Sequence, residues 1–158
     1  SKPKLKIGYS YRSSRRFFYD ISTLRSDFVL EADSVLHMLY MLGYSRHGDL
    51  EYGYDKRYPK KPAKQIVYFA GASMKNKCWS EDKFTALIGQ LSDQYPDYQH
   101  VILQGIRDDE KFLEIYNPIS NKKNVNLQET MSLEGVMQFL SNSHLLISND
   151  TGIRNMAI

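Results

Sequence analysis

The sequence lacks features that would place it in several common classes of protein. It has one cysteine, Cys78, among 158 residues, so neither an intramolecular disulfide nor a cysteine zinc cluster can form. Its longest apolar runs, 66–70 and 145–147, have the length of strands and fall short of the roughly 18–20 residues that a membrane-spanning helix needs. Residues 1–20 are basic and tyrosine-rich, without the apolar centre of a secretory signal. We therefore expect a globular protein of the reducing cytoplasm.

Motifs that mark several enzyme classes are also missing. There is no G-x-G-x-x-G, so a standard dinucleotide-binding fold is not indicated, and no G-x-x-x-x-G-K-[ST], so the P-loop hydrolases are excluded. The four histidines, at 37, 47, 100 and 144, show no metal-ligand spacing. We expect neither a metal nor a cofactor.

Charge and tyrosine are unevenly distributed along the chain. Residues 1–64 hold 13 Lys and Arg against 7 Asp and Glu, and eight of the 12 tyrosines, whereas residues 65–158 hold 8 against 11. A shift of this size predicts two structural units, with the boundary after residue 64. We expect the second to be truncated, because the chain stops at Ile158, about two turns into its last expected helix.

Strands and helices alternate at short spacing after residue 64. The run Gln65–Ala70 is continuous and rich in β-formers, as in a strand buried on both faces of a parallel sheet, and Ser80 with two following acids marks a helix start. The alternation predicts an α/β fold, a Rossmann-like parallel sheet with covering helices. The expected elements are strand 65–70, helix 80–95, strand 101–103, helix 108–116, strand 124–127, helix 132–140, strand 145–148 and a helix from 153.

The pattern before residue 65 is weaker. It suggests a strand at 5–9, a basic aromatic loop at 12–18 and a helix at 32–42 that Gly43 stops. Residues 45–64 have little periodicity, which suits a linker.

The loop after the first predicted strand of the sheet suits an anion. Gly71 allows a tight turn, Ser73 adds a hydroxyl, and Lys75 or Lys77 adds a cation beside the start of the 80–95 helix. A solvated loop with two surface lysines explains the same residues equally well.

Two further loops fall on the same expected edge of the sheet, where parallel sheets bind ligands. Asp150, Thr151 and Gly152 follow the last strand at a helix start, where they could face a phosphate or merely cap the helix. Asp109 follows the second predicted strand, 101–103, and is a weaker candidate for accepting hydrogen bonds from ribose hydroxyls. Since the first and last of these loops share one edge, together they point to a phosphate ligand more strongly than either does alone.

These loops resemble those of glycosyltransferase family 9, which includes the lipopolysaccharide heptosyltransferases. Residues 69–73 followed by Lys77-Cys78-Trp79 match the family's strand, small-residue turn and Lys-x-Trp pattern. Residues 148–152, with Met156-Ala157, resemble its Asp-Thr-Gly signature and the helix after it. The resemblance covers residues 65–158 and is weak before them.

The resemblance implies a GT-B arrangement, in which two Rossmann-like domains face each other across a cleft. Residues 65–158 would be the donor-binding half and residues 1–64 the end of the acceptor half. The implied reaction is inverting, metal-independent transfer of a heptose-like sugar from a nucleotide donor, such as ADP-heptose, to a lipopolysaccharide-type glycolipid or oligosaccharide acceptor. By position, the implied donor-site residues are Ser73 and Lys77 at the phosphates, Asp150, Thr151 and Gly152 at the sugar and diphosphate, Asp109 near the ribose, and Gly71, Lys75 and Asn155 as weaker candidates.

The chain departs from the family pattern in two respects. Asn155 stands where typical members have a histidine, with an unusual Arg154 beside it, and an amide keeps a hydrogen bond but cannot become positively charged. Most of the acceptor domain is also absent, so the catalytic base is expected outside this chain. We therefore expect no turnover by the chain alone.

Two other functions stay open. Segments 12–19 and 56–64 mix basic and aromatic groups as single-strand nucleic-acid binders do, although no recognised nucleic-acid motif is present and the net charge is only +3. A solvated basic face, compatible with peripheral contact with an anionic membrane or glycolipid at the inner membrane face, explains them more simply. The other alternative is a degenerate, non-catalytic family member, which Asn155 suggests.

Overall fold

The computed structural model describes residues 4–10, 17–24, 31–45, 47–48 and 54–157. The chain forms two compact units, Ser1–Leu50 and Glu51–Ile158. The composition shift places this boundary later, after residue 64. The observed and expected boundaries differ because the basic segment before β3 bonds to the second unit. Lys61 N–H donates to the Ser141 carbonyl at 3.1 Å, and Ala63 N–H donates to the Asn142 carbonyl at 2.9 Å.

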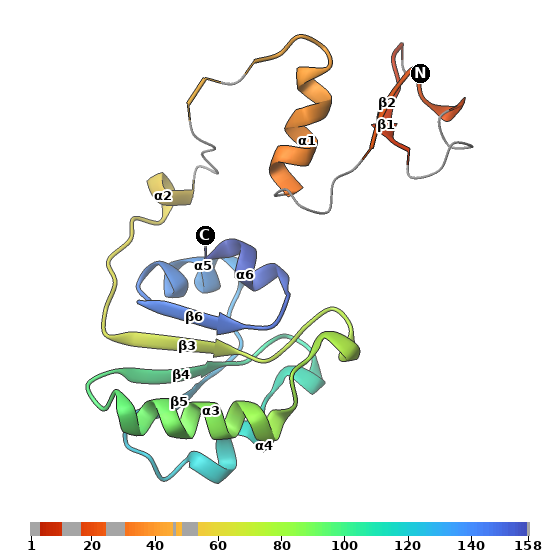
Figure 1. Ribbon diagram of the computed structural model, residues 1–158. Coiled ribbons are helices and arrows are strands. Elements are labelled where there is room, and N and C mark those ends of the chain that lie inside the picture. Colours follow the sequence, from red (N-terminus) through yellow and green to blue (C-terminus); the bar gives the residue numbers. More distant parts are fainter. Residues whose placement is uncertain (1–3, 11–16, 25–30, 46, 49–53, 158) are drawn as a thin grey trace. The chain divides into compact units, whose positions relative to one another are not determined.

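The first unit contains a short parallel strand pair and one helix (Figure 1). Strand β1 (Ile7–Tyr9) pairs with β2 (Ile21–Thr23), and helix α1 spans Glu31–Tyr40. The predicted strand and helix are therefore confirmed, whereas β2 lies in a segment for which the sequence predicts no strand. Gly43 adopts a φ of 84°, the left-handed conformation that ends helices and that glycine tolerates best. Of the predicted basic loop, residues 12–16 lie outside the described part of the chain.

The second unit contains a four-stranded parallel sheet. All four strands predicted after residue 64 are present, and the described helices lie between or beside them. In chain order, the elements are α2 (Tyr54–Arg57), β3 (Gln65–Phe69), η2 (Lys75–Lys77), α3 (Glu81–Gln94), β4 (Gln99–Leu103), η3 (Asp108–Glu110), α4 (Leu113–Tyr116), η4 (Asn117–Ile119), β5 (Val125–Gln128), α5 (Leu133–Ser141), β6 (Leu145–Ser148) and α6 (Gly152–Met156).

The strand order of this sheet is β5-β4-β3-β6, and every neighbouring pair is parallel. The chain first moves outward from β3 to β4 and β5, then returns past β3 to β6. The order therefore reverses beside β3, and in Rossmann-like sheets the crevice at such a reversal is the usual place for a ligand. The Rossmann-like parallel α/β fold expected from the alternating pattern is confirmed.

Helices cover both faces of this sheet. Figure 1 shows α3 and α4 on one side and α5 and α6 on the other, as right-handed crossovers require for this strand order. The predicted cap of α5 is present, since the Ser132 hydroxyl accepts a bond from Gly135 N–H. None of the described helices is long and apolar enough to cross a membrane.

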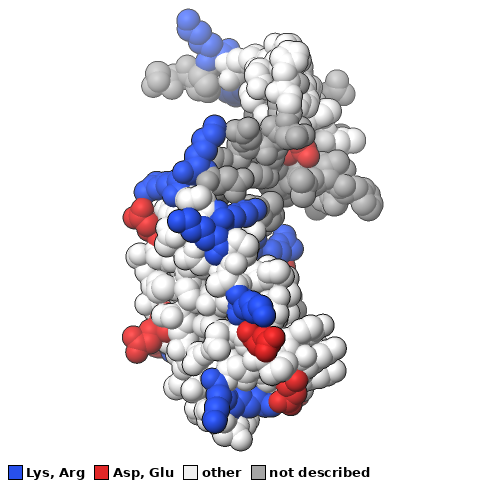
Figure 2. Space-filling view, turned by 90° about the vertical axis from the view of Figure 1, so that its left-hand side faces the viewer, with Lys and Arg blue, Asp and Glu red and all other residues white. Residues whose placement is uncertain are grey.

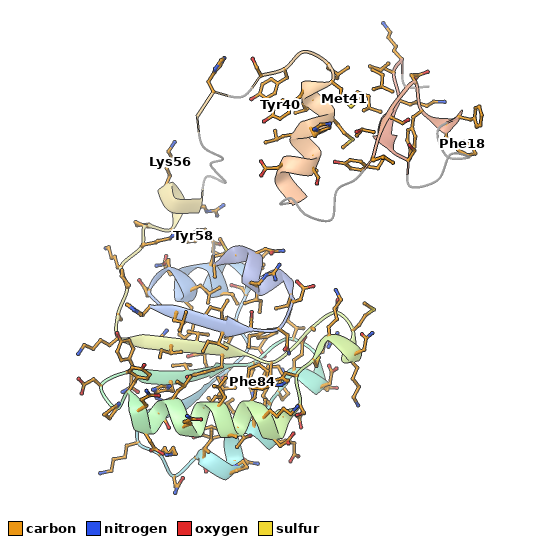
Figure 3. The ribbon with its side chains drawn as sticks, in the orientation of Figure 1. Phe18, Tyr40, Met41, Lys56, Tyr58 and Phe84 are labelled. Carbon is orange, nitrogen blue, oxygen red and sulfur yellow. The ribbon has the colours of Figure 1, made fainter. Side chains whose placement is uncertain are left out.

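The core of the second unit lies on both sides of β3 and β4. Phe84 and Ile88 on α3 are buried against the sheet, with Phe84 2% exposed (Figure 3). Tyr68 and His100 lie side by side in this core, and the Tyr68 hydroxyl is 2.8 Å from His100 Nδ1. The strands hold this arrangement, so the loops at their carboxyl ends start from a rigid base.

The predicted helix 108–116 is wrong in one respect. The segment forms a 3₁₀ turn, η3, and then a separate short helix, α4, because Phe112 between them has a φ of 53°. This left-handed conformation interrupts the helix, and the buried Phe112 ring packs edge-on against Phe69 with centroids 5.6 Å apart. Packing against the sheet therefore overrides the local helical pattern.

Candidate functional site

The loops that follow β3 and β6 meet at the carboxyl edge of the sheet. Asn149 fastens them together: its Nδ2 donates to the Ala70 carbonyl at 2.6 Å, and its Oδ1 accepts from Trp79 N–H at 3.1 Å. Because β3 and β6 are adjacent parallel strands, their carboxyl ends already lie side by side. No sequence motif marks Asn149 as a site residue, since a single polar residue before an Asp-Thr-Gly segment gives no signal of this role.

Asp150 lies between two cations at this junction. Its Oδ2 is 3.1 Å from Lys77 Nζ, and its Oδ1 is 3.2 Å from Arg154 Nη2. The hydrogen bond and charge of Lys77, and then the charge of Arg154, hold the pKa of Asp150 below its usual value. Since Lys77 and Asp150 are separated by 73 residues in the chain, this contact shows that the two predicted loops form one polar site.

The Asp-Thr-Gly segment leaves open space beside its glycine. A Cβ atom added to Gly152 would meet nothing within 4 Å, and Thr151 makes no side-chain capping bond to α6. The capping alternative is therefore not what the structure shows for Thr151. Ser73 and Asn155 are both exposed, on the β3 loop and on α6 respectively. The site is open to solvent on this side.

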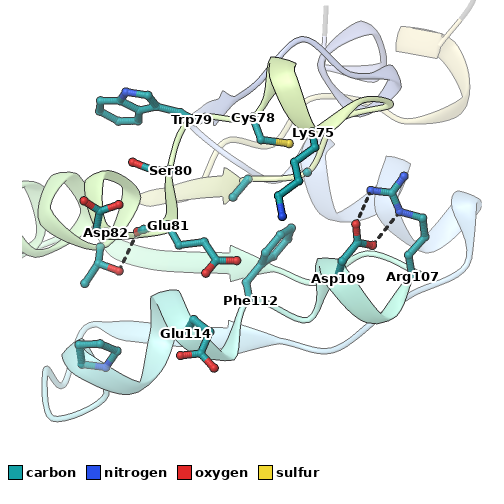
Figure 4. Close-up of a pocket in the computed structure, with 14 residues that line it drawn as sticks. Lys75, Cys78, Trp79, Ser80, Glu81, Asp82, Arg107, Asp109, Phe112 and Glu114 are labelled. Atoms are coloured by element: carbon teal, nitrogen blue, oxygen red, sulfur yellow. Dashed lines mark hydrogen bonds and ion pairs between the residues drawn. The ribbon is translucent and has the colours of Figure 1, made fainter.

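The two lysines of the β3 loop serve different places. Lys77 contacts Asp150, whereas Lys75 points into a separate pocket of about 830 Å³ between the β3 loop, the start of α3 and the η3–α4 segment (Figure 4). Gly71 and Asp109 also line this pocket, but Ser73, Lys77 and the Asp150 segment do not. Its charged lining comprises the carboxylates of Glu81, Asp82, Asp109 and Glu114 and the cations of Lys75 and Arg107.

An excess of carboxylates makes this pocket unfavourable for a diphosphate, because like charges repel more strongly where water is partly excluded. Trp79 and Phe112 supply its aromatic surface. The junction around Lys77 is therefore the better place for an anionic group. The sequence allows either Lys75 or Lys77 as the cation for a phosphate, and this geometry favours Lys77 over Lys75.

Asp109 is held by Arg107, a residue that no sequence motif marks as part of the site. Arg107 donates from Nε to Asp109 Oδ1 at 2.9 Å and from Nη2 to Oδ2 at 3.0 Å, and Nη2 also reaches the Ala72 carbonyl at 3.2 Å. The bond to Ala72 ties the β4 loop to the β3 loop, and Figure 4 shows the pairing of Arg107 with Asp109. A ribose hydroxyl would have to share the Asp109 carboxylate with this arginine, so the structure weakens Asp109 as a ribose ligand.

Two glycines at the strand ends are required by packing. The Glu110 carboxylate lies in the space where a Cβ atom of Gly71 or Gly105 would be, at 2.8 and 2.2 Å respectively. Glu110 is largely buried, with 14% of its side chain exposed. The structure therefore gives Gly71 a packing role beside Glu110, in addition to the tight turn that the sequence suggests.

Among the described residues, no group of three or more His, Cys, Asp or Glu side chains is arranged to hold a metal ion. The charged groups of the junction are two cations and one carboxylate, so they carry a net positive charge, which favours an anion.

The family described as Glycosyltransferase family 9 (heptosyltransferase) matches residues 4–158, nearly the whole chain. The chain belongs to glycosyltransferase family 9. Because the match begins at residue 4, membership of family 9 extends through the first unit, where the motifs alone show only weak similarity.

Solved family 9 structures share this fold. The E. coli heptosyltransferase WaaC with ADP-2-deoxy-2-fluoro heptose has a TM-score of 0.71 at 21% identity, covering 97% of this chain and 50% of that one. WaaC with ADP has a TM-score of 0.69 at 21% identity, covering 89% and 45%. The family 9 glycosyl transferase of Veillonella parvula DSM 2008 has a TM-score of 0.63 at 17% identity, covering 99% and 48%. The chain thus spans about half the length of these structures, and no curated protein matches its sequence.

In this family 9 chain, the structure brings Lys77 and the Asp150–Gly152 segment together and adds Arg154 to them. It leaves Ser73 and Asn155 exposed at the margin and separates Lys75, Gly71 and Asp109 into the adjacent pocket. Their roles toward a ligand stay predictions.

Proposed function

We propose that residues 65–158 belong to the donor-binding half of a GT-B glycosyltransferase, that residues 1–64 are the end of its acceptor half, and that a nucleotide-activated sugar binds at the junction of the β3 and β6 loops. Membership of family 9 supports this, as do the solved WaaC structures with ADP and with an ADP-heptose analogue. The observation that carries the proposal is the contact between Lys77 and Asp150, which unites two distant loops at the reversal of the strand order.

The proposed donor is an ADP-activated heptose-like sugar. The diphosphate lies against Lys77, and the sugar lies towards Asp150, Thr151 and the open space at Gly152. A carboxylate accepts hydrogen bonds from sugar hydroxyls, and the room beside Gly152 admits a ring without a steric clash. In this proposal the diphosphate does not occupy the adjacent acidic pocket.

The proposed reaction is inverting, metal-independent transfer to a lipopolysaccharide-type acceptor. The glycosidic bond to the diphosphate breaks, and the bonding pair stays on the leaving phosphate oxygen, which gains negative charge. A lysine ammonium already placed there stabilises this charge more in the transition state than in the ground state. The base that takes the proton of the acceptor hydroxyl belongs to the acceptor half of the enzyme in this proposal.

The basic segment leading into β3 is proposed to face an anionic surface, either a membrane or the acceptor glycolipid. Figure 2 shows Lys and Arg side chains on the face that carries residues 56–64, with some Asp and Glu among them. Lys60 and Lys61 are exposed there, and each basic group near an anionic surface adds about 1 kcal/mol to attraction at low screening. This face lies outside the donor junction. Binding of the chain to anionic lipid vesicles tests its proposed contact with a membrane separately.

The donor proposal is tested by thermal melting of the chain with ADP, UDP, GDP and CMP. At about 100 times its dissociation constant, a ligand adds about 2.7 kcal/mol to the free energy of unfolding. We expect the largest shift with ADP. In Lys77→Ala the ADP shift should fall to about half or less, because binding should weaken at least ~10-fold, or about 1.4 kcal/mol. Lys111→Ala, which removes a lysine bonded to Gly105 and Thr130 at another loop, is the matched control for lost charge. No shift with any nucleotide, or equal binding by Lys77→Ala, would overturn the proposal.

A further inference from the structure

We propose that Arg154 is a second cation for the donor diphosphate, and that in the free protein Asp150 occupies both cations until the diphosphate displaces it. This inference rests on the proposed donor site and names how that site is prepared for its ligand. It concerns three side chains only: Lys77, Asp150 and Arg154.

The geometry shows one carboxylate shared by two cations. Each oxygen of Asp150 serves a different partner, with Oδ2 at 3.1 Å from Lys77 Nζ and Oδ1 at 3.2 Å from Arg154 Nη2. The two cations therefore flank a single anionic group. A diphosphate presents two linked anionic groups, so it can satisfy both cations where one carboxylate now does.

The exposure of these groups indicates that they can exchange partners. The exposed side-chain fractions are 39% for Lys77, 57% for Asp150 and 56% for Arg154. Ion pairs this exposed contribute little to folding stability, because water screens them. The cluster is therefore poorly explained as a device for stability, and a ligand can reach every member of it.

Charge also favours the exchange. The three groups together carry one positive charge, so the junction attracts an anion even while Asp150 is in place. Arginine keeps its charge throughout the physiological range and offers several N–H donors in a planar fork, which suits phosphate oxygens. Asn155, the next residue, is uncharged, so Arg154 is the cation that α6 brings to this junction.

Displacement would also let Asp150 bind the sugar. While both oxygens bond to cations, about two of the roughly four acceptor sites of the carboxylate are occupied, and the group is held between Lys77 and Arg154. Once a diphosphate takes Lys77 and Arg154, the carboxylate is released beside the open space at Gly152, where it can accept hydrogen bonds from sugar hydroxyls. Binding of the diphosphate and recognition of the sugar are thereby coupled through one side chain.

The simpler alternative is that Arg154 pairs with Asp150 only as an i,i+4 contact at the start of α6. In that case Arg154 would affect the local helix and not the ligand. The two readings differ in what happens to nucleotide affinity and in how Asp150 variants behave.

The test measures binding of ADP, AMP and ADP-heptose to the chain by calorimetry. Arg154→Gln should weaken ADP at least ~10-fold and AMP less than ~3-fold, because AMP lacks the second phosphate. Arg154→Lys should recover part of the loss. Arg57→Gln is the matched control, since Arg57 is also an exposed arginine paired with a carboxylate, Glu134, at 2.7 Å; it should bind ADP as the unaltered chain does. Melting curves confirm that each variant is folded.

Asp150→Asn tests the displacement itself. Since the variant removes the competing anion, ADP should bind equally well or more tightly, while the extra affinity of ADP-heptose over ADP should be lost. Weaker ADP binding by Asp150→Asn would overturn the displacement. If Arg154→Gln binds ADP within twofold of the unaltered chain while Lys77→Ala loses it, Arg154 has no such role and the proposed donor site stands. If the unaltered chain binds no nucleoside diphosphate, both proposals fail.

Discussion

Removing one hydroxyl from the core should destabilise the second unit measurably. Tyr68 and His100 are 1% and 0% exposed, and their polar atoms form a chain of two hydrogen bonds. The Tyr95 carbonyl, 3.2 Å from His100 Nε2, can only accept, so Nε2 carries the proton. Nδ1 is then the acceptor for the Tyr68 hydroxyl at 2.8 Å. Both groups are satisfied only while the imidazole is neutral and the phenol is present.

In Tyr68→Phe, His100 Nδ1 would lose its donor in a place that water does not reach. An unsatisfied buried acceptor costs about 1–3 kcal/mol in the free energy of unfolding. For a unit of this size, each kcal/mol lowers the melting temperature by about 4–8 °C. Tyr95→Phe is the control: the Tyr95 side chain is 44% exposed and its backbone carbonyl stays in place, so its effect should be within about 0.5 kcal/mol.

The same pair predicts a pH dependence of stability. Burial lowers the pKa of His100 below its usual 6.5, so below that pH the unfolded chain binds a proton that the folded chain resists. The free energy of unfolding should therefore fall as the pH falls below about 6.5, by at most about 1.4 kcal/mol per pH unit from this residue. Urea unfolding at several pH values measures this, and His100→Gln should remove that part of the slope. A Tyr68→Phe protein as stable as the unaltered chain, or a slope unchanged in His100→Gln, would refute the reasoning.

Two further predictions concern the edge of the sheet. Gly105→Ala should lower the free energy of unfolding by about 1–3 kcal/mol, because the added Cβ would lie 2.2 Å from the Glu110 carboxylate. Gly152→Ala should be tolerated, because nothing lies within 4 Å of the added Cβ. Equal melting temperatures for the two variants would contradict this packing argument. Asn149→Ala should loosen the β3 loop at the end of β6, since it removes both side-chain bonds of Asn149. Faster hydrogen exchange at the Trp79 amide is the expected sign, and unchanged exchange there would show that other contacts hold the loop.

Several features of the fold could be predicted because they depend on neighbours in the chain. A short run rich in β-formers, such as 65–69, favours a buried strand, and Ser132 and Gly43 act on backbone groups within a few residues of themselves. The alternation of such runs with helical stripes then leaves a parallel sheet as the architecture.

Other features depend on residues far apart in the chain. The break at Phe112 follows from the contact of its ring with Phe69, and η3 and α4 replace the expected helix for that reason. The Arg107–Asp109 pair likewise depends on how the η3 turn points, which no local pattern indicates.

The sequence by itself determined that the chain forms a parallel α/β sheet and that its polar loops follow the strands, because hydrophobic periodicity and helix caps act over short distances. The tertiary structure alone decided which side chains share the site. Lys75 and Lys77 are two residues apart and chemically identical, yet the turn of η2 directs Lys75 into the acidic pocket and Lys77 to Asp150. The gathering of Lys77 and Arg154 around Asp150 is decided in the same way, because Lys77 reaches Asp150 only where β6 pairs with β3 and brings both loops to one edge.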